Sequence, residues 1–242
     1  MRSTMLILRA GRLRLTAVSV AMLALNASDA QTPAATNAVK QPIRTVRGEP
    51  ALPRGWLLRF DPLQQPAQKS FQVSEVRFLE SDNSLLVESG PAAIYYRPVD
   101  RTSGDFSIAA TFTHSKSIGH EAFGMFFGGS HLQDSTQRYL YFVIRTQGGA
   151  FLVSKREGDQ PPTPIVPWTE SPAIAESRGR LGASTNKLMI RARGDSVFFL
   201  ANGTRVASIS LAATGFTSAG DIGLRVNHNI GLRVEDFRIT RP

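Results

Sequence analysis

The stretch that decides the fold is Phe106-Ser107-Ile108-Ala109-Ala110-Thr111-Phe112-Thr113. Apolar residues occupy positions 106, 108, 110 and 112, and the residues between them are small or polar. Successive side chains of a β-strand point to opposite faces, so this period of two predicts a strand with one face in a core.

The same alternation recurs along the chain, between stretches rich in Gly, Asn, Asp and Pro that are typical of turns. The clearest turn is Asn202-Gly203, because both residue types tolerate the positive φ that a two-residue hairpin needs. Apart from a short turn of helix at 171–177, no segment after the N-terminal region has a helical period, so the body is predicted to be all-β. The strands are expected at 56–60, 72–78, 84–88, 92–97, 122–129, 138–146, 150–156, 187–193, 197–201, 205–210, 221–226 and 230–240.

Residues 1–30 are predicted to be a signal peptide. Four arginines precede a mostly apolar run at 16–25, and Ser28 and Ala30 form a small-residue cleavage site before Gln31. The run is shorter than the about 20 residues of a membrane span, so we expect no membrane span in the mature protein. We expect a periplasmic or secreted protein, with a flexible linker at 31–53 and one domain at 54–242.

Composition narrows the classes of function. The net charge is +9, and removal of residues 1–30 with their four arginines and Asp29 leaves +6. The remaining basic residues are interspersed with acids, which argues against a nucleic-acid partner. The chain has no cysteine, which excludes disulfides, thiolate nucleophiles and Cys-ligated zinc.

The order of features over residues 105–239 resembles the concanavalin A-like superfamily, especially laminin-G-like modules and a bacterial domain of the 3-keto-disaccharide hydrolase type. The resemblance implies a jelly-roll sandwich of two antiparallel sheets. It also implies association with glycans or proteins, or cleavage of glycosidic bonds. It rests on the segments 105–108, 123–128, 139–144, 186–190, 197–203 and 220–224, whose shared features are structural rather than catalytic.

Catalytic motifs are absent from the sequence. Glycosidases of this superfamily carry Glu-x-Asp-x-x-Glu on one strand, whereas Glu157-Gly158-Asp159 runs into two prolines and is interpreted as loop charge. No pair of histidines has the spacing of a helical zinc site, so no metal site is assigned. No cofactor is expected, although a calcium site assembled from separate loops stays open.

Candidate ligand-binding residues come from one predicted hairpin and its surroundings. If Gly148-Gly149 is a two-residue turn, Tyr141, Arg145 and Arg156 share the face opposite to core residues such as Phe142. Tyrosine offers a ring for stacking on a sugar, and arginine offers a fork of donors.

Two further candidates come from loops. Trp168 follows the Pro-rich segment 160–164, and His120 stands beside Glu121. For Trp56 and Trp168, core packing is the alternative to sugar stacking.

The leading hypothesis is therefore a non-catalytic glycan-binding module that is exported and takes a sugar ligand. A glycoside hydrolase of the 3-keto-disaccharide type and an envelope protein-interaction module stay open as alternatives. Two carboxylates facing each other would favour the enzyme, and a flat apolar patch would favour protein association.

Overall fold

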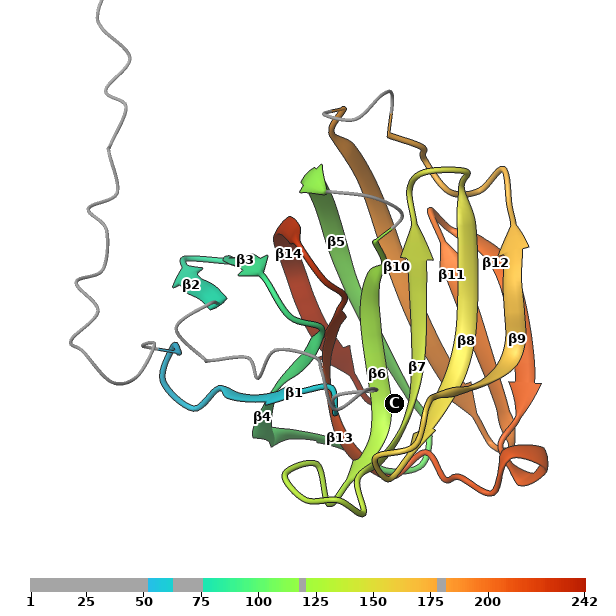
Figure 1. Cartoon of the computed structure of the whole chain (residues 1–242). Helices are drawn as coiled ribbons and strands as arrows, with labels where there is room; N and C mark the ends of the chain where they lie inside the picture. The colour runs from blue at the N-terminus through green and yellow to red at the C-terminus, as the bar shows by residue number, and fades with distance from the viewer. Residues whose placement is uncertain (1–51, 63–75, 118–120, 178–181) are drawn as a thin grey trace, which may run out of the picture. The chain divides into compact units, whose positions relative to one another are not determined.

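The computed structural model describes residues 52–62, 76–117, 121–177 and 182–242, which all fall in one compact unit, Ile43–Pro242. These residues form two seven-stranded antiparallel sheets packed face to face (Figure 1). The predicted all-β sandwich is confirmed. The signal peptide at 1–30, most of the linker at 31–53 and the beginning of the strand expected at 72–78 lie outside the described residues.

Sheet I contains the candidate ligand face, and sheet II covers its inner side. In spatial order, sheet I consists of β1 (Leu57–Phe60), β4 (Ala93–Thr102), β13 (Gly220–Val226), β6 (Phe123–Ser130), β7 (Arg138–Arg145), β8 (Ala150–Glu157) and β9 (Thr163–Glu170). Sheet II consists of β12 (Thr204–Ser210), β11 (Ser196–Ala201), β10 (Ser184–Arg193), β5 (Phe106–Ser117), β14 (Ile230–Thr240), β3 (Ser84–Ser89) and β2 (Val76–Ser81).

The core lies between the sheets and follows the alternation of the sequence. Phe106, Ile108 and Phe112 of β5 point into it, as do Phe142 and Ile144 of β7. Removal of this apolar surface from water is the main stabilisation of the sandwich, because each fully buried aliphatic or aromatic side chain contributes about 1.5–3 kcal/mol.

The turn at Asn202-Gly203 is confirmed. Ala201 pairs with Thr204, and Asn202 and Gly203 both have positive φ, at 50° and 84°. The side-chain Nδ2 of Asn202 also donates to the Ala173 carbonyl oxygen at 2.9 Å, which ties the hairpin to the neighbouring loop.

The predicted register of the β7–β8 hairpin is wrong by two residues. Arg145 pairs with Ala150, so residues 146–149 form the turn instead of Gly148-Gly149 alone. Thr146 is held outside the ladder because its Oγ1 bonds to His114 Nδ1 at 3.1 Å and to Ser177 Oγ at 3.2 Å. A shift by an even number of residues leaves every side chain on its face, so the predicted grouping of Tyr141, Arg145 and Arg156 survives.

Two further expectations need correction. Trp168 does not lie on a loop, because the segment after the prolines forms the edge strand β9, where Pro164 and Pro167 are tolerated since one side of an edge strand has no partner strand. The segment 171–177 contains a turn but no helix. Within the described residues, the helical element is a single 3-10 turn, η2 (Ala212–Thr214), and no helix is long and apolar enough to cross a membrane.

Candidate functional site

The outer face of sheet I, the face turned away from sheet II, carries a second buried apolar layer. A sandwich needs to bury only the inner face of each sheet, so a second apolar layer is a feature that packing between the sheets does not explain. The layer consists of Ile94, Tyr96, Ala122, Phe126, Leu132, Tyr139, Tyr141, Val143 and Leu152.

The strand register brings polar side chains into this layer. Tyr139 pairs with Arg156 across β7 and β8, and Tyr141 pairs with Ser154. On β13, Arg225 points outward because its neighbours Leu224 and Val226 point into the core. Four strands of sheet I, β13, β6, β7 and β8, thus build one continuous outer surface.

Three charged side chains meet on this surface, and one of them comes from a remote part of the chain. Asp61 follows the edge strand β1, and its carboxylate accepts two hydrogen bonds from Arg225, Nη1 to Oδ1 at 2.8 Å and Nη2 to Oδ2 at 2.6 Å. Arg156 Nη2 donates to Asp61 Oδ2 at 2.9 Å, and Arg156 Nη1 donates to the Gln160 carbonyl oxygen at 2.6 Å. We call Asp61, Arg156 and Arg225 the arginine cluster.

The arginine cluster is largely out of contact with solvent. The side chains of Arg156 and Arg225 are 0% and 5% exposed, and that of Asp61 is 23% exposed. Burial by itself raises the pKa of Asp61, but attraction by Arg225 and Arg156 and the hydrogen bonds from Arg225 outweigh it and leave that pKa below its ordinary value. Asp61 is therefore an anion bound by its neighbours and a poor proton donor.

Glycine at position 124 lies beside Arg225 and permits the close approach of β6 to β7. Arg225 pairs with Gly124 on β6, and its guanidinium extends beyond β6 to lie over the Tyr141 ring on β7, 5.6 Å from the ring centre. A Cβ atom at position 124 would lie 2.1 Å from the Phe142 carbonyl oxygen, so no other residue fits without movement of the backbone.

The rim of the outer face holds an exposed aromatic ring. Trp168 of β9 is 39% exposed, and the Arg145 guanidinium lies over its ring at 4.7 Å from the centre. Glu170 shares this side of the strand, because Arg145, Ala150 and Glu170 are directly paired across β7, β8 and β9. Among the described residues, Arg145 Nε is buried without a hydrogen-bond partner. We call Arg145 and Trp168 the rim pair.

The structure brings four of the five predicted residues to one face. Arg145 and Trp168 form the rim pair. Tyr141 and Arg156 are buried instead, Tyr141 within the apolar layer and Arg156 within the arginine cluster, which sequence reasoning did not foresee. His120 lies outside the described residues.

Sequence reasoning missed three residues of the site. Arg225 was recognisable in principle as an outward residue between Leu224 and Val226. Tyr139 was recognisable as well, because it alternates with Leu140 and Phe142. Asp61 gave no local signal, because its partners are 95 and 164 residues away in the sequence.

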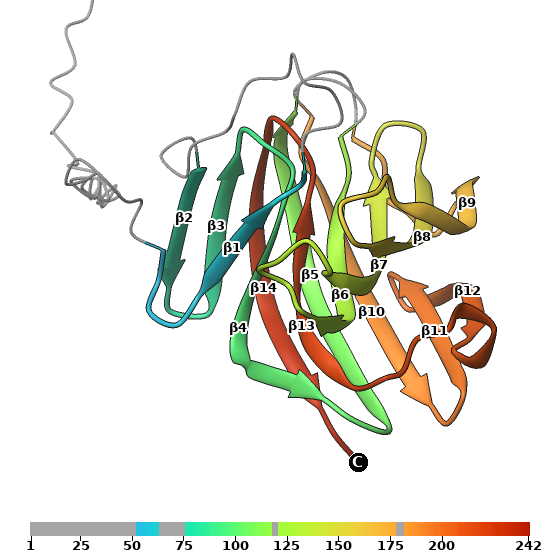
Figure 2. The ribbon, with the colours of Figure 1, turned by 60° about the horizontal axis from the view of Figure 1, so that its bottom comes forward.

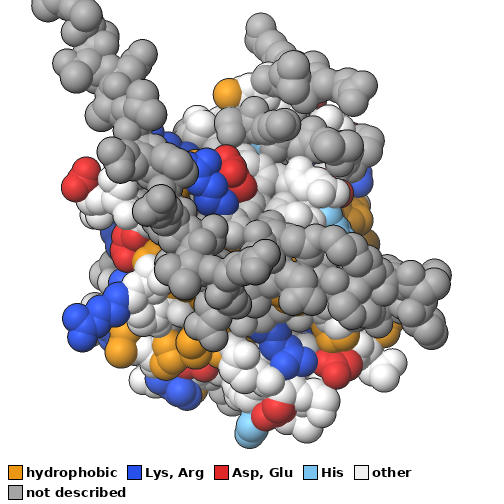
Figure 3. Space-filling view, turned by 60° about the vertical axis from the view of Figure 1, so that its left-hand side comes forward, with side chains coloured by type: hydrophobic (Ala, Val, Ile, Leu, Met, Phe, Trp, Pro, Cys, Tyr) orange, Lys and Arg blue, Asp and Glu red, His pale blue; other side chains and the backbone are white. Residues whose placement is uncertain are grey.

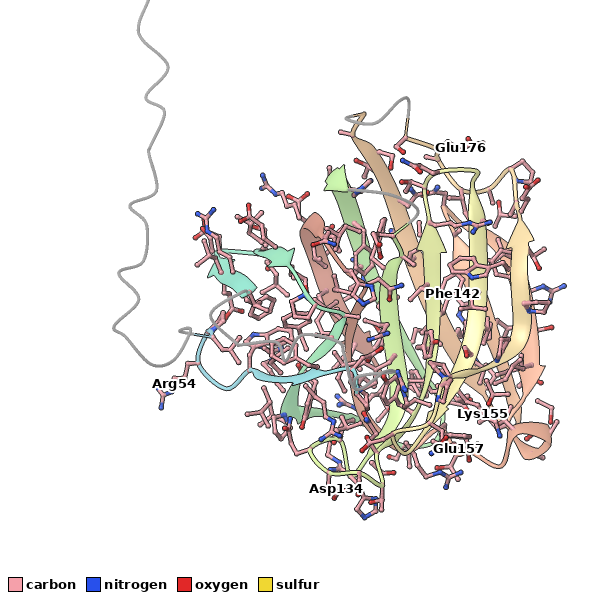
Figure 4. All side chains as sticks on the ribbon, in the orientation of Figure 1. Arg54, Asp134, Phe142, Lys155, Glu157 and Glu176 are labelled. Atoms are coloured by element: carbon pink, nitrogen blue, oxygen red, sulfur yellow. The ribbon has the colours of Figure 1, made fainter. Side chains whose placement is uncertain are left out.

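The other candidates have structural roles. Trp56 is buried in the core and meets Phe78 edge to face, at 5.0 Å between ring centres. Glu157 ends β8 and pairs with Lys155 and Arg138, while Asp159 pairs with Arg59. Figure 4 shows Lys155 and Glu157 together at one end of β8, with Glu176 at the opposite end of the strands.

Among the residues that the structure describes, no second carboxylate pairs with Asp61 to form a catalytic pair. Burial raises the pKa of Asp221 on β13, and Arg101 opposes that rise from 3.1 Å. Asp221 and Arg225 are four residues apart on β13, about 13 Å at the usual rise of a strand, so Asp221 sits far from the Asp61 carboxylate. In the part of the chain that the structure describes, no three His, Asp or Glu side chains gather to hold a metal ion.

A separate cavity of about 350 Å³ opens between the sheets, where β9 and β12 lie side by side (Figure 2). Its lining is mixed, with Ile165, Val166 and Ile209 beside Lys155 and several hydroxyl groups. The cavity lies on the inner side of sheet I, and none of the residues of the arginine cluster or the rim pair lines it.

Surface charge does not single out another site on the side shown in Figure 3. Where that view shows described residues, Lys and Arg side chains stand beside Asp and Glu.

Comparison of the sequence with protein-family models and with curated proteins finds no match. Solved structures do resemble the chain. The carbohydrate-binding module CBM66 from Bacillus subtilis is 13% identical over 77% of this chain and 96% of that chain, with a TM-score of 0.55. An endo-beta-1,3-glucanase from Pyrococcus furiosus is 9% identical over 78% of this chain and 88% of that chain, with a TM-score of 0.50. At this identity the likeness concerns the fold alone, a sandwich of two antiparallel β-sheets.

Proposed function

We propose that this protein is an exported, non-catalytic glycan-binding module that uses the outer face of sheet I. The observation that carries the proposal is the rim pair, in which an exposed tryptophan ring and an arginine with an unpartnered Nε stand side by side. Sugar rings stack their C–H faces on aromatic rings, and guanidinium groups donate to hydroxyl and carboxylate oxygens. The fold adds support, because a carbohydrate-binding module is among the structures it resembles.

Two alternatives receive less support. A retaining glycosidase needs two carboxyl groups about 5 Å apart, one of them free to donate a proton, whereas Asp61 is held as an anion by two arginines. A protein-docking surface needs a contiguous apolar patch, whereas the large exposed apolar residues of the described chain, Leu57, Val99 and Trp168, lie on three different strands.

A glycan array with the purified protein tests the proposal, followed by titration of the best ligand into Trp168→Ala. The variant should bind about five- to thirtyfold more weakly, since loss of a stacked ring removes on the order of 1–2 kcal/mol. Leu57→Ala is a matched control, because Leu57 is also 39% exposed but lies on β1, at the other edge of sheet I. Equal loss in both variants, or no glycan bound by the parent protein, would contradict the proposal.

Export is the second part of the proposal and rests on the pattern of residues 1–30. Cleavage after Ala30 gives a mature protein that begins at Gln31. Sequencing of the N-terminus of protein recovered from the periplasm or the medium should find Gln31 or a residue close to it. Recovery of Met1 from those fractions would contradict cleavage.

A further inference from the structure

The arginine cluster holds more positive than negative charge. Two guanidinium groups that are almost completely buried, Arg156 and Arg225, share the single carboxylate of Asp61. Tyr139 and Tyr141 beside them are phenols, and burial raises the pKa of Tyr139, so Tyr139 adds no negative charge near neutral pH. Among the described residues, one buried positive charge is therefore left without a counter-ion.

The donors of the cluster are incompletely used as well. Both terminal nitrogens of Arg225 donate to Asp61, whereas Arg156 donates from one terminal nitrogen to Asp61 and from the other to the Gln160 carbonyl. The Nε atoms of both arginines are buried and have no hydrogen-bond partner in the described structure. Buried donors of charged groups are normally satisfied, so unsatisfied ones beside excess positive charge indicate an anion that the described residues do not supply.

A purely structural role accounts for only part of this arrangement. The bidentate pair between Asp61 and Arg225 fastens the segment after β1 to the middle of sheet I, and one arginine suffices for that. The second arginine adds a desolvated charge, which is unfavourable unless a further anion pairs with it. Contact of Arg225 with the Tyr141 ring offsets this only in part.

The arginine cluster and the rim pair lie along one line. Tyr141 and Arg145 are four residues apart on the same face of β7, about 13 Å at the usual rise of a strand. A short oligosaccharide spans such a distance. The exposed part of Asp61 marks the side from which solvent reaches the cluster, and Arg145 carries an additional unpartnered Nε at the rim.

We propose that the ligand of this face is an acidic glycan, whose uronic acid carboxylates pair with the arginine cluster and with Arg145 while a sugar ring stacks on Trp168. This inference rests on the proposed glycan-binding function and assigns its ligand class. Carboxylates fit because their anionic oxygens accept strong, charge-assisted hydrogen bonds from guanidinium N–H groups. The exposed carboxylate of Glu170 at the rim repels a second carboxylate placed over it, which orients the acidic sugar residues toward Arg145 and the arginine cluster.

The test compares one oligosaccharide in two forms by calorimetry with the full mature protein: a uronic acid oligomer, and the same oligomer with its carboxyl groups reduced to alcohols. The acidic form should bind at least about tenfold more tightly, the usual size of a charge-assisted hydrogen bond. Equal binding of the two forms would overturn the inference and leave the proposed function standing. Absence of binding by both forms, and by the whole glycan array, would overturn both.

Single variants then test which arginines cause the preference for the acidic form. Arg145→Gln, at the partly exposed rim, should reduce the preference for the acidic form several-fold with little change in melting temperature. Arg156→Gln should reduce it further, because it leaves Arg225 and Asp61 as a neutral pair. Arg138→Gln is the control, since it removes the same charge from β7 but at a residue that pairs with Glu157 and lies over Phe216.

A sulfated neutral oligosaccharide separates carboxylate recognition from general attraction of anions. Binding of the sulfated form as tightly as the uronic acid oligomer would overturn the assignment to carboxylates. An unchanged preference in both Arg145→Gln and Arg156→Gln would overturn the assignment to this face.

Discussion

The string Gly-Leu-Arg-Val occurs twice, at residues 223–226 of β13 and 231–234 of β14, and its two arginines meet opposite environments. In both copies the leucine and the valine point into the same core. The Arg225 side chain is 5% exposed and pairs with Asp61, whereas the Arg233 side chain is 58% exposed and pairs with Glu235, two residues further along its own strand.

The difference arises from what covers each sheet. β13 belongs to sheet I, whose outer face carries the second apolar layer, and β14 belongs to sheet II. Alternation places both arginines outward, but only on sheet I does the rest of the chain remove the outward side chain from water. An identical local sequence thus yields a solvated surface residue in one place and part of a candidate binding site in the other.

Loss of the shared carboxylate is expected to have the largest effect. Asp61→Asn leaves two buried guanidinium charges without an anion, so the free energy of unfolding should fall by about 3–5 kcal/mol. Urea denaturation measures this as a lower midpoint with an unchanged slope. Asp159→Asn is the control, because Asp159 pairs with Arg59 at the surface and should cost less than about 1 kcal/mol. A similar small loss for both variants would show that the cluster does not hold the structure together.

The two copies of the string can be compared directly. Arg225→Gln removes two hydrogen bonds to a charged group but leaves Arg156 with Asp61, so about 2 kcal/mol of stability should be lost. Arg233→Gln should change stability by less than about 1 kcal/mol, as is usual for an exposed pair. Equal losses of stability in the two variants would contradict the proposed difference between the two sheets.

A double variant sharpens this comparison. In the Asp61→Asn background, Arg225→Gln should lower the free energy of unfolding only slightly, because it removes one of the two uncompensated charges there. Strict additivity of the two losses would mean that the two residues do not interact.

The pH dependence is expected to show the smallest effect. Because the pKa of Asp61 in the folded protein lies below its ordinary value of 3.8, the ionised carboxylate stabilises the fold above that value. The advantage of the parent protein over Asp61→Asn should therefore be complete near neutral pH and disappear as the pH falls through the lowered pKa. Unfolding curves of both proteins at several pH values measure it. A difference that stays constant down to the acid transition would contradict the assignment, and Arg233→Gln should follow the parent protein throughout.

Much of the fold could be predicted from short-range patterns. Alternation at Phe106-Ser107-Ile108 gave the correct inner face of β5, and the hairpin at Asn202-Gly203 formed where positive φ was expected. The grouping of Tyr141, Arg145 and Arg156 on one face survived a wrong register, because the shift was an even number of residues.

The errors share a physical cause. Thr146 left the β7–β8 ladder to bond with His114 and Ser177, which are remote in the sequence. The Pro-rich segment became the edge strand β9 because a neighbouring strand was free to pair with it on one side. Neither event has a signal in the residues concerned.

The sequence by itself determined which side chains face the core and which face outward, because backbone geometry alternates residue by residue. The tertiary structure decided which outward side chains are buried, as with Arg156 and Arg225, and which remain accessible, as with Trp168. It also brought Asp61 to its two arginines. Burial and ion pairing depend on segments that are far apart in the sequence, so no local pattern records them.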